Sequence, residues 1–311
     1  MQRYSHLHKL HTPQHPRIAM FLHCRGTDSC PITSTHSLSS PSSSPPPPPI
    51  APTSPGLGKF EITIPATKMW EAGINVLAID YRNHGASSNV IQKKSGKQVI
   101  MWGTTEYHDP LAAAAWLHTT KGFAWNKIGI YGASMGGATA LIAAAKEPRL
   151  KSIWVDSPAC DPWEILNHGG KKFGGGILAG ISSPITDWGV AIGKSWMDDP
   201  TQWTTNQPYD VVKKYTADQS VQFVTTAGDD TVPSYVVKTC VDAAKTSKAK
   251  VSYWEYNDIK LHNTNTANKK FDKDRVADGT HVEAVLYDTD LYAKRIVDWY
   301  NSTLGMGCPA K

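Results

Sequence analysis

The chain has 311 residues and a formal net charge of +5, from 32 Lys and Arg against 27 Asp and Glu. Residues 1–60 hold five of these basic residues and one acid, which leaves 27 basic and 26 acidic residues at positions 61–311. This nearly neutral body argues against a surface for nucleic acids, because phosphate binding requires clustered Lys and Arg.

Residues 1–58 have the composition of a low-complexity leader rich in Ser and Pro. They contain 11 of the 21 prolines, including the run 45–49, which cannot form a helix or a sheet ladder. The leader is basic and Ser-rich, as transit peptides are, and it lacks the apolar core of a secretory signal. Three interpretations stay open: a targeting segment, a disordered segment and a misassigned start of the reading frame. A cytoplasmic or organellar location is favoured over secretion.

Residues 59–311 are long enough for one enzyme-sized domain with a single core. No apolar run reaches the ~18 residues that a bilayer span requires, so we expect no transmembrane segment. The five cysteines are Cys24, Cys30, Cys160, Cys240 and Cys308. Because they show no C-x-x-C spacing, they predict neither a zinc site nor a disulfide framework, and mostly reduced thiols are expected.

Short β-branched runs alternate with helix-like segments along this body, which is typical of a parallel sheet covered on both faces. Strands are predicted at 74–80, 127–131, 151–156, 221–226 and 250–256. Helices are predicted at 106–119, 135–146, 234–246 and 281–300. The pattern predicts an α/β fold with a mostly parallel central sheet.

Residues 127–141 contain a buried strand, the motif G-x-S-x-G around Ser134 and an alanine-rich helix, which is the context of a nucleophile elbow. Gly132 and Gly136 flank the serine because side chains there would collide where strand and helix cross closely. A P-loop would need Gly-Lys-Ser/Thr where the chain has Gly136-Gly137-Ala138, and a dinucleotide fingerprint would need G-x-G-x-x-G. Ser134 is therefore the predicted nucleophile.

Two further segments carry motifs that accompany such an elbow. Residues 80–87 read D-x-R-x-H-G-x-S, and residues 103–109 read G-x-x-E-x-x-D. Over about residues 67–304 the chain resembles the α/β-hydrolase superfamily, closest to its esterase, monoacylglycerol-lipase and serine-aminopeptidase-like branches. The resemblance implies the α/β-hydrolase fold, with helices on both faces of the sheet, and a triad in the chain order Ser, acid, His.

The same resemblance points to the acid and the base. Residues 221–233 are similar to the family's strand and D-x-x-V-P loop, and counting back from the Val-Pro pair selects Asp229. Asp230 is the fallback, and Asp156, at the end of another predicted strand, is a weaker alternative. His281 lies on a Gly-containing loop before the last predicted helix, where the family places its base. His262, inside a polar insertion, is its competitor.

An oxyanion hole requires two backbone donors. The amide of Met135, directly after the elbow serine, is expected to supply one. The other normally comes from a loop after an earlier strand, and residues 18–26 could form such a strand and loop, with Cys24 or Arg25 as donor. The alternative places all of 1–58 outside the fold and makes 60–64 the first strand, in which case the oxyanion loop would be missing.

Residues 157–215 depart from the alternation of strands and helices. In the family such an insertion often forms a lid over the acyl pocket, and a pair of ordinary packed helices explains the same sequence equally well. We predict a serine hydrolase that cleaves a carboxylic ester, or a thioester or amide, of a small molecule through an acyl-enzyme, with no metal and no cofactor. The competing hypothesis is an inactive binding or regulatory protein of this fold, or an incomplete gene product without the oxyanion loop. Acyl specificity and oligomeric state leave no pattern in the sequence.

Overall fold

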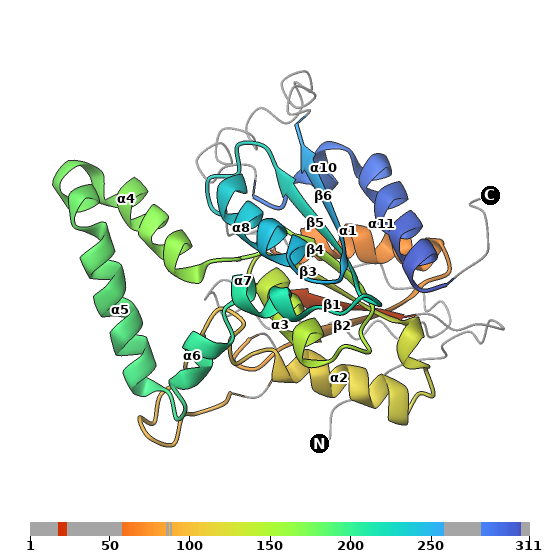
Figure 1. The fold of residues 1–311 in the computed structure, drawn as a ribbon, viewed down its shortest axis with the longest axis horizontal. Helices are drawn as coiled ribbons and strands as arrows, with labels where there is room; N and C mark the ends of the chain where they lie inside the picture. Colours follow the sequence, from red (N-terminus) through yellow and green to blue (C-terminus); the bar gives the residue numbers. More distant parts are fainter. Residues whose placement is uncertain (1–17, 24–57, 85–86, 88, 258–280, 306–311) are drawn as a thin grey trace, which may run out of the picture.

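The structure, a computed structural model, describes residues 18–23, 58–84, 87, 89–257 and 281–305. Its centre is a six-stranded sheet in the order β2-β1-β3-β4-β5-β6, in which each neighbouring pair is parallel (Figure 1). The strands are β1 (Ile18–His23), β2 (Asn75–Asp80), β3 (Ile128–Ala133), β4 (Ser152–Asp156), β5 (Ser220–Thr226) and β6 (Lys250–Tyr256).

Helices cover both faces of this sheet. On one face α1 packs against α10 and α11, and on the other α3 contacts α2 and α7, while α7 contacts α8. The helices are α1 (Gly58–Glu71), α2 (His108–Thr119), α3 (Met135–Lys146), α4 (Pro162–Gly180), α5 (Ser182–Trp196), α6 (Thr201–Thr205), α7 (Pro208–Val211), α8 (Ser234–Lys245), α10 (Ala284–Tyr287) and α11 (Thr289–Thr303). Two 3-10 turns lie at Trp125–Lys127 and Val212–Lys214.

The core lies in two layers because successive strand residues point to opposite faces of the sheet. In β3, Ile130 is buried in the cluster that includes Leu141 of α3. The next residue, Tyr131, is buried in the cluster that includes Tyr300 of α11. A strand that is buried on both faces has no polar side, which explains the continuous apolar runs in the sequence.

The predicted strands are all present, and their ends differ from the expected ones by at most two residues. The single helix predicted at 281–300 is wrong, since the chain forms α10 and α11 with a break at Asp288. Asp288 has φ −145° and ψ 80°, and its carboxylate accepts from the amide of Leu291. This carboxylate caps α11, and an Asp that bonds a nearby amide in this way competes with a continuous helix.

Residues 18–23 form β1 in the interior of the sheet, between β2 and β3. The alternative with 60–64 as a first strand is wrong, because these residues lie within helix α1. Residues 60–64 alternate apolar and polar side chains as a strand does, but a pattern of five residues is too short to separate a strand from a helix. Ile64 of this segment packs against the core cluster that contains Met69 and Ile74.

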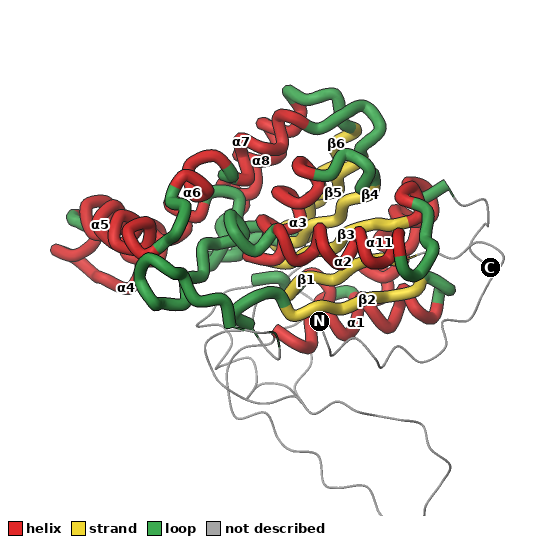
Figure 2. The backbone as a smooth tube through the Cα atoms, turned by 90° about the horizontal axis from the view of Figure 1, so that it is seen from below, coloured by secondary structure: helices red, strands yellow, loops and turns green. Residues whose placement is uncertain are grey.

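Helices α4 and α5 form a hairpin inserted between β4 and β5. Figures 1 and 2 both show this hairpin standing away from the sheet. Side chains join its two arms: Trp163 Nε1 donates to Asp187 Oδ1 over 2.7 Å, and Ser182 Oγ donates to Asn167 Oδ1 over 2.9 Å. Among the helices that the structure describes, none is long and apolar enough to cross a membrane.

The two motifs outside the elbow contact each other. Arg82, from the first motif, forms a two-pronged ion pair with Asp109 from the second, with Nη2 2.8 Å from Oδ1 and Nε 3.0 Å from Oδ2. Glu106 is fully buried, and its carboxylate accepts from the amides of Met101 and Gly103. These contacts fix the turn after β2 to the start of α2, which gives both motifs a structural role.

Candidate active site

Ser134 stands at the sharp turn between β3 and α3. Its backbone has φ 54° and ψ −123°, a conformation that side chains rarely adopt and that is concentrated at functional sites. A Cβ at Gly132 would lie 2.2 Å from the carbonyl oxygen of Gly136, so only glycine fits where the strand and the helix cross. The flanking glycine expected from the sequence is thus required by backbone contact.

The backbone of Ser134 is held by the segment that follows the neighbouring strand β4. The Ser134 amide donates to the carbonyl of Asp156 over 2.9 Å, and the amide of Ala159 donates to the carbonyl of Ser134 over 3.1 Å. Ala133 and Asp156 are partners in the parallel ladder between β3 and β4. The turn that presents Ser134 is therefore held by hydrogen bonds at both the amide and the carbonyl of the serine.

The structure brings Ser134, Asp229 and His281 together. His281 Nδ1 lies 2.9 Å from Asp229 Oδ2, and His281 Nε2 lies 2.9 Å from Ser134 Oγ. A carboxylate only accepts hydrogen bonds, so Nδ1 carries the ring proton and Nε2 accepts from the serine hydroxyl. This arrangement can remove a proton from the hydroxyl as its oxygen attacks a carbonyl carbon.

Asp229 is oriented by its own loop. Its side chain is fully buried, whereas 20% of the His281 side chain is exposed. Asp229 Oδ1 accepts from the amides of Thr231 and Val232, over 3.1 and 2.9 Å, which leaves Oδ2 for the imidazole. One oxygen thus holds the carboxylate in place while the other holds the ring.

Two further non-glycine residues with positive φ lie next to these side chains. Val282, directly after His281, has φ 57°, and Ser157, directly after Asp156, has φ 41°. A β-branched residue at positive φ is a clear outlier. The amide of Ala284 donates to Thr226 Oγ1 at the end of β5, which ties the His281 loop to the strand that carries Asp229. Thr226 belongs to none of the motifs in the sequence, so the pattern gave no sign of this contact.

Asp156 belongs to a separate buried network. Tyr292 of α11 donates to Asp156 Oδ2 over 2.8 Å and accepts from Trp154 Nε1 over 3.0 Å. Burial raises the pKa of Asp156 to about 6, although the hydrogen bond from Tyr292 favours the charged form. Burial likewise raises the pKa of Tyr292 well above 10. The residue pairs of this network are too far apart in the chain for a local motif.

The remaining candidates have different surroundings. Asp230 directs its backbone carbonyl toward His168 of α4, whose Nε2 donates to it over 3.1 Å. Met135 is the first residue of α3. The other candidates, Cys24, Arg25 and His262, lie outside the described residues. Within the described ranges, no group of three or more His, Cys, Asp or Glu side chains is arranged to hold a metal ion.

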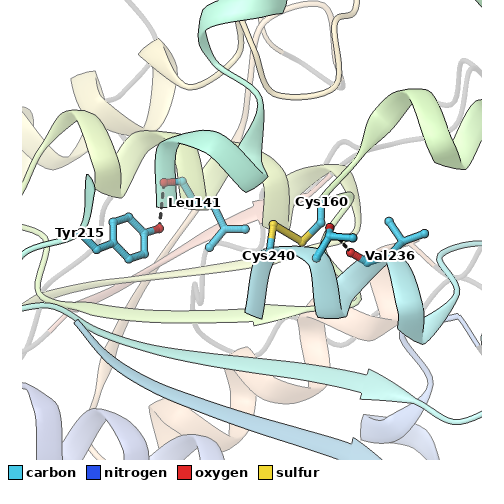
Figure 3. The surroundings of a disulfide bond; sticks show 6 residues. Leu141, Cys160, Tyr215, Val236 and Cys240 are labelled. Atoms are coloured by element: carbon cyan, nitrogen blue, oxygen red, sulfur yellow. Dashed lines mark hydrogen bonds between the residues drawn. A yellow bond between two sulfur atoms is a disulfide. The ribbon is translucent and has the colours of Figure 1, made fainter. Parts of the chain in front are cut away.

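The expectation of mostly reduced cysteines is wrong for one pair. Cys160, just before α4, and Cys240 of α8 form a disulfide with their Cα atoms 5.6 Å apart (Figure 3). Both residues are fully buried. They are 80 residues apart in the chain, so spacing alone offered no basis for pairing them.

A parallel sheet with a strained serine elbow, followed along the chain by an acid and a histidine that meet it, defines an α/β hydrolase. The predicted α/β-hydrolase fold is confirmed. The chain belongs to the family described as serine aminopeptidase, S33, which matches residues 63–245. The match includes Ser134 and Asp229 and ends before His281.

Solved structures show the same fold at low identity. The esterase Pf2001 of Pyrococcus furiosus is 16% identical, with a TM-score of 0.57 over 94% of this chain and 84% of its own. DcsB, solved in a complex with its substrate analogue, is 14% identical, with a TM-score of 0.52 over 94% of this chain and 91% of its own. No curated protein gives a significant match to the sequence.

Proposed function

We propose that the protein is a serine hydrolase that cleaves a carboxylic ester of a small molecule through an acyl-enzyme. Ser134 is the nucleophile, His281 the general base and Asp229 the carboxylate that orients the base. The observation that carries this proposal is the continuous line of hydrogen bonds from Ser134 Oγ through both ring nitrogens of His281 to Asp229. The strained backbone at the nucleophile supports it.

In the first half of the reaction, His281 Nε2 takes the hydroxyl proton as Ser134 Oγ attacks the ester carbonyl. Asp229 stabilises the imidazolium, and His281 then returns the proton to the leaving alcohol. In the second half, His281 activates a water molecule that hydrolyses the acyl-enzyme and releases the acid. No step requires a metal or an organic cofactor.

The oxyanion of the tetrahedral intermediate requires two backbone donors. We assign one to the amide of Met135 at the start of α3, where the helix dipole also favours negative charge. We assign the other to the amide of Cys24 or Arg25. The position of β1 supports this assignment, because Leu22 pairs in register with Gly132, two residues before the nucleophile. The end of β1 thus lies beside the elbow.

An ester is favoured over a peptide bond because Pf2001, which shares the fold, is described as an esterase. The family description names an aminopeptidase, so an aminoacyl amide is the alternative substrate. Of the two interpretations of residues 157–215, a lid or a pair of packed helices, we favour a lid formed by the α4–α5 hairpin. The hairpin is inserted between β4 and β5, directly after the segment that holds Ser134.

A fluorophosphonate probe and a pair of chromogenic substrates test the proposal. The probe should modify Ser134 in the folded protein, and p-nitrophenyl esters should be cleaved faster than aminoacyl p-nitroanilides. Ser134→Ala and His281→Ala should each lower kcat by at least about 10³-fold. An unmodified Ser134, beside a reactive control hydrolase, would favour a non-enzymatic protein. Loss of activity in His262→Ala with retention in His281→Ala would identify a different base.

A further inference from the structure

The base of the α4–α5 hairpin is joined to the segment 230–240 by a row of three side-chain contacts, which we call the hairpin-root row. The first is the disulfide between Cys160 and Cys240. In the second, Tyr235 donates its hydroxyl hydrogen to Glu164 Oε1 over 3.0 Å. In the third, His168 Nε2 donates to the carbonyl of Asp230 over 3.1 Å, and the rings of His168 and Tyr235 meet edge to face at 6.4 Å.

The spacing of these contacts shows that they form one structural unit. Glu164 and His168 are four residues apart in α4, which places them above one another on a single helical face, and Cys160 precedes the helix by two residues. Their partners follow in the opposite direction along the chain, from Cys240 through Tyr235 to Asp230. The row thus runs from the middle of α8 back to the loop that carries Asp229.

Each end of this row is next in the chain to a residue of the candidate site or to a residue that holds it. At one end, Cys160 follows Ala159, whose amide donates to the carbonyl of Ser134. At the other, His168 holds the carbonyl of Asp230, which is adjacent to Asp229 in the chain. The row therefore connects the segment behind the nucleophile with the loop that orients the acid.

We propose that the root of α4 is a positioning element for Asp229, with the Cys160–Cys240 disulfide as its covalent member. This inference rests on the proposed function. Hydrogen bonds within its own loop orient the Asp229 carboxylate, and the row holds that loop from outside at the carbonyl of Asp230. A misalignment of about 1 Å at a reacting group can lower a rate by roughly 10²-fold. Loss of the row lowers turnover without removing the nucleophile or the base.

The disulfide makes the proposal testable by a reversible reaction. A thiolate of a dithiol such as dithiothreitol attacks one protein sulfur, which breaks the protein S–S bond and forms a mixed disulfide. The second thiol of the reagent then displaces the protein sulfur. The products are two cysteine thiols and one oxidised, cyclic reagent, so two electrons and two protons move to the protein. Because both cysteines are buried, the reaction requires transient opening and is followed until thiol counting shows completion.

The first measurement compares kcat, KM and the pH profile of p-nitrophenyl ester cleavage before and after reduction, at a temperature where both forms are folded. Reduction should lower kcat roughly 10-fold with KM changed less than about twofold, because the loss falls on the aligned reaction step. The acid limb of the profile should move to lower pH, since a looser carboxylate stabilises the imidazolium less. Reoxidation should restore kcat and the position of the acid limb. Addition of the dithiol to Cys160→Ala should change neither quantity, because this variant has no disulfide to reduce. Unchanged kcat and pH profile, with only a lower Tm, would overturn the proposal.

Substitutions at His168 test the non-covalent part of the row against a matched control. His168→Leu removes the donor to Asp230 and should reproduce the shift of the acid limb, whereas His168→Gln keeps an N–H donor and should restore it. Ser95→Ala is the control, because Ser95 Oγ donates to the carbonyl of Trp196 at the other root of the hairpin. Equal effects of Ser95→Ala and His168→Leu would mean that general loosening of the hairpin is responsible, and the proposal would fail.

Hydrogen exchange separates this proposal from the proposed function. On reduction, the amides of residues 229–232 should exchange faster, and those of the 91–98 turn should not change. This readout does not require activity. If exchange at 229–232 is unchanged, the positioning role is refuted even in an active enzyme. If exchange rises while Ser134 resists the fluorophosphonate in the oxidised protein, the proposed function fails and the mechanical connection stands.

Discussion

Replacing Asp156 by Asn should change how the stability of the protein depends on pH. Asp156 is fully buried at the end of β4, and burial raises its pKa from 3.8 to about 6. A carboxyl whose pKa is higher in the folded than in the unfolded state favours folding while it is protonated. That stability is fully present below about pH 4, and it is lost as the pH rises to about 6.

The size of the effect follows from the difference between the two pKa values. A difference of about two pKa units corresponds to roughly 3 kcal/mol between full protonation and full ionisation, at about 1.4 kcal/mol per unit. About half of this, roughly 1.5 kcal/mol, falls between pH 5 and pH 8, because the unfolded chain is already mostly ionised at pH 5. Asp156→Asn removes this titration and keeps an oxygen that can accept from Tyr292.

Urea unfolding of both proteins at half-unit steps from pH 5 to pH 8 measures the effect. The difference in unfolding free energy, variant minus wild type, should rise by roughly 1.5 kcal/mol over this range, whatever the pH-independent effect of the amide. Asp218→Asn is the control, because Asp218 is exposed and pairs with Lys151 at the surface. A difference that stays constant within about 0.3 kcal/mol would refute the claim that the pKa of Asp156 is higher in the folded than in the unfolded protein.

Three further substitutions test the backbone packing and the cross-link of the fold. Gly132→Ala should destabilise the protein by roughly 2–3 kcal/mol, because its Cβ would lie 2.2 Å from the Gly136 carbonyl oxygen. Gly169→Ala, with no atom within 4 Å of its Cβ, should instead stabilise α4 by up to about 1 kcal/mol, and equal Tm changes in the two would contradict this account. Cys160→Ala should lower the unfolding free energy by roughly 4 kcal/mol, because the bond to Cys240 closes a loop of 80 residues. Calorimetry under non-reducing conditions should show a drop in Tm of roughly 8–16 °C, and an unchanged Tm would mean that the thiols are free.

The sequence was most informative where a local pattern determines a local structure. The strand bounds follow from apolar runs, and Ser134 follows from the glycines that its turn requires. Asp229 and His281 could be selected because each lies in a short motif at a strand end or before a helix. Their hydrogen bonds to one another depend on the register of the sheet, which no single segment encodes.

The features that escaped prediction involve residues that are distant in the chain and follow no motif. Tyr292 reaches Asp156 from a helix 136 residues away. Cys160, from the segment between β4 and α4, pairs with Cys240 of α8. Residues 18–23 could not be assigned from the sequence, because a short run with five apolar residues fits both a strand of the fold and a segment of the leader, and only their place between β2 and β3 settles the assignment.

That place has a consequence for any shortened form of the protein. A polypeptide that starts at residue 58 would keep β2 and β3 but lose the strand that pairs with both. Its sheet would present two facing rows of unpaired amides and carbonyls, which attract any extended chain. Proteolysis within 24–57 would therefore produce two fragments that belong to one sheet, and a synthetic peptide containing residues 18–23 could refill the gap in trans. The domain would then assemble from two separate chains, and its folding would depend on binding of the peptide that supplies β1.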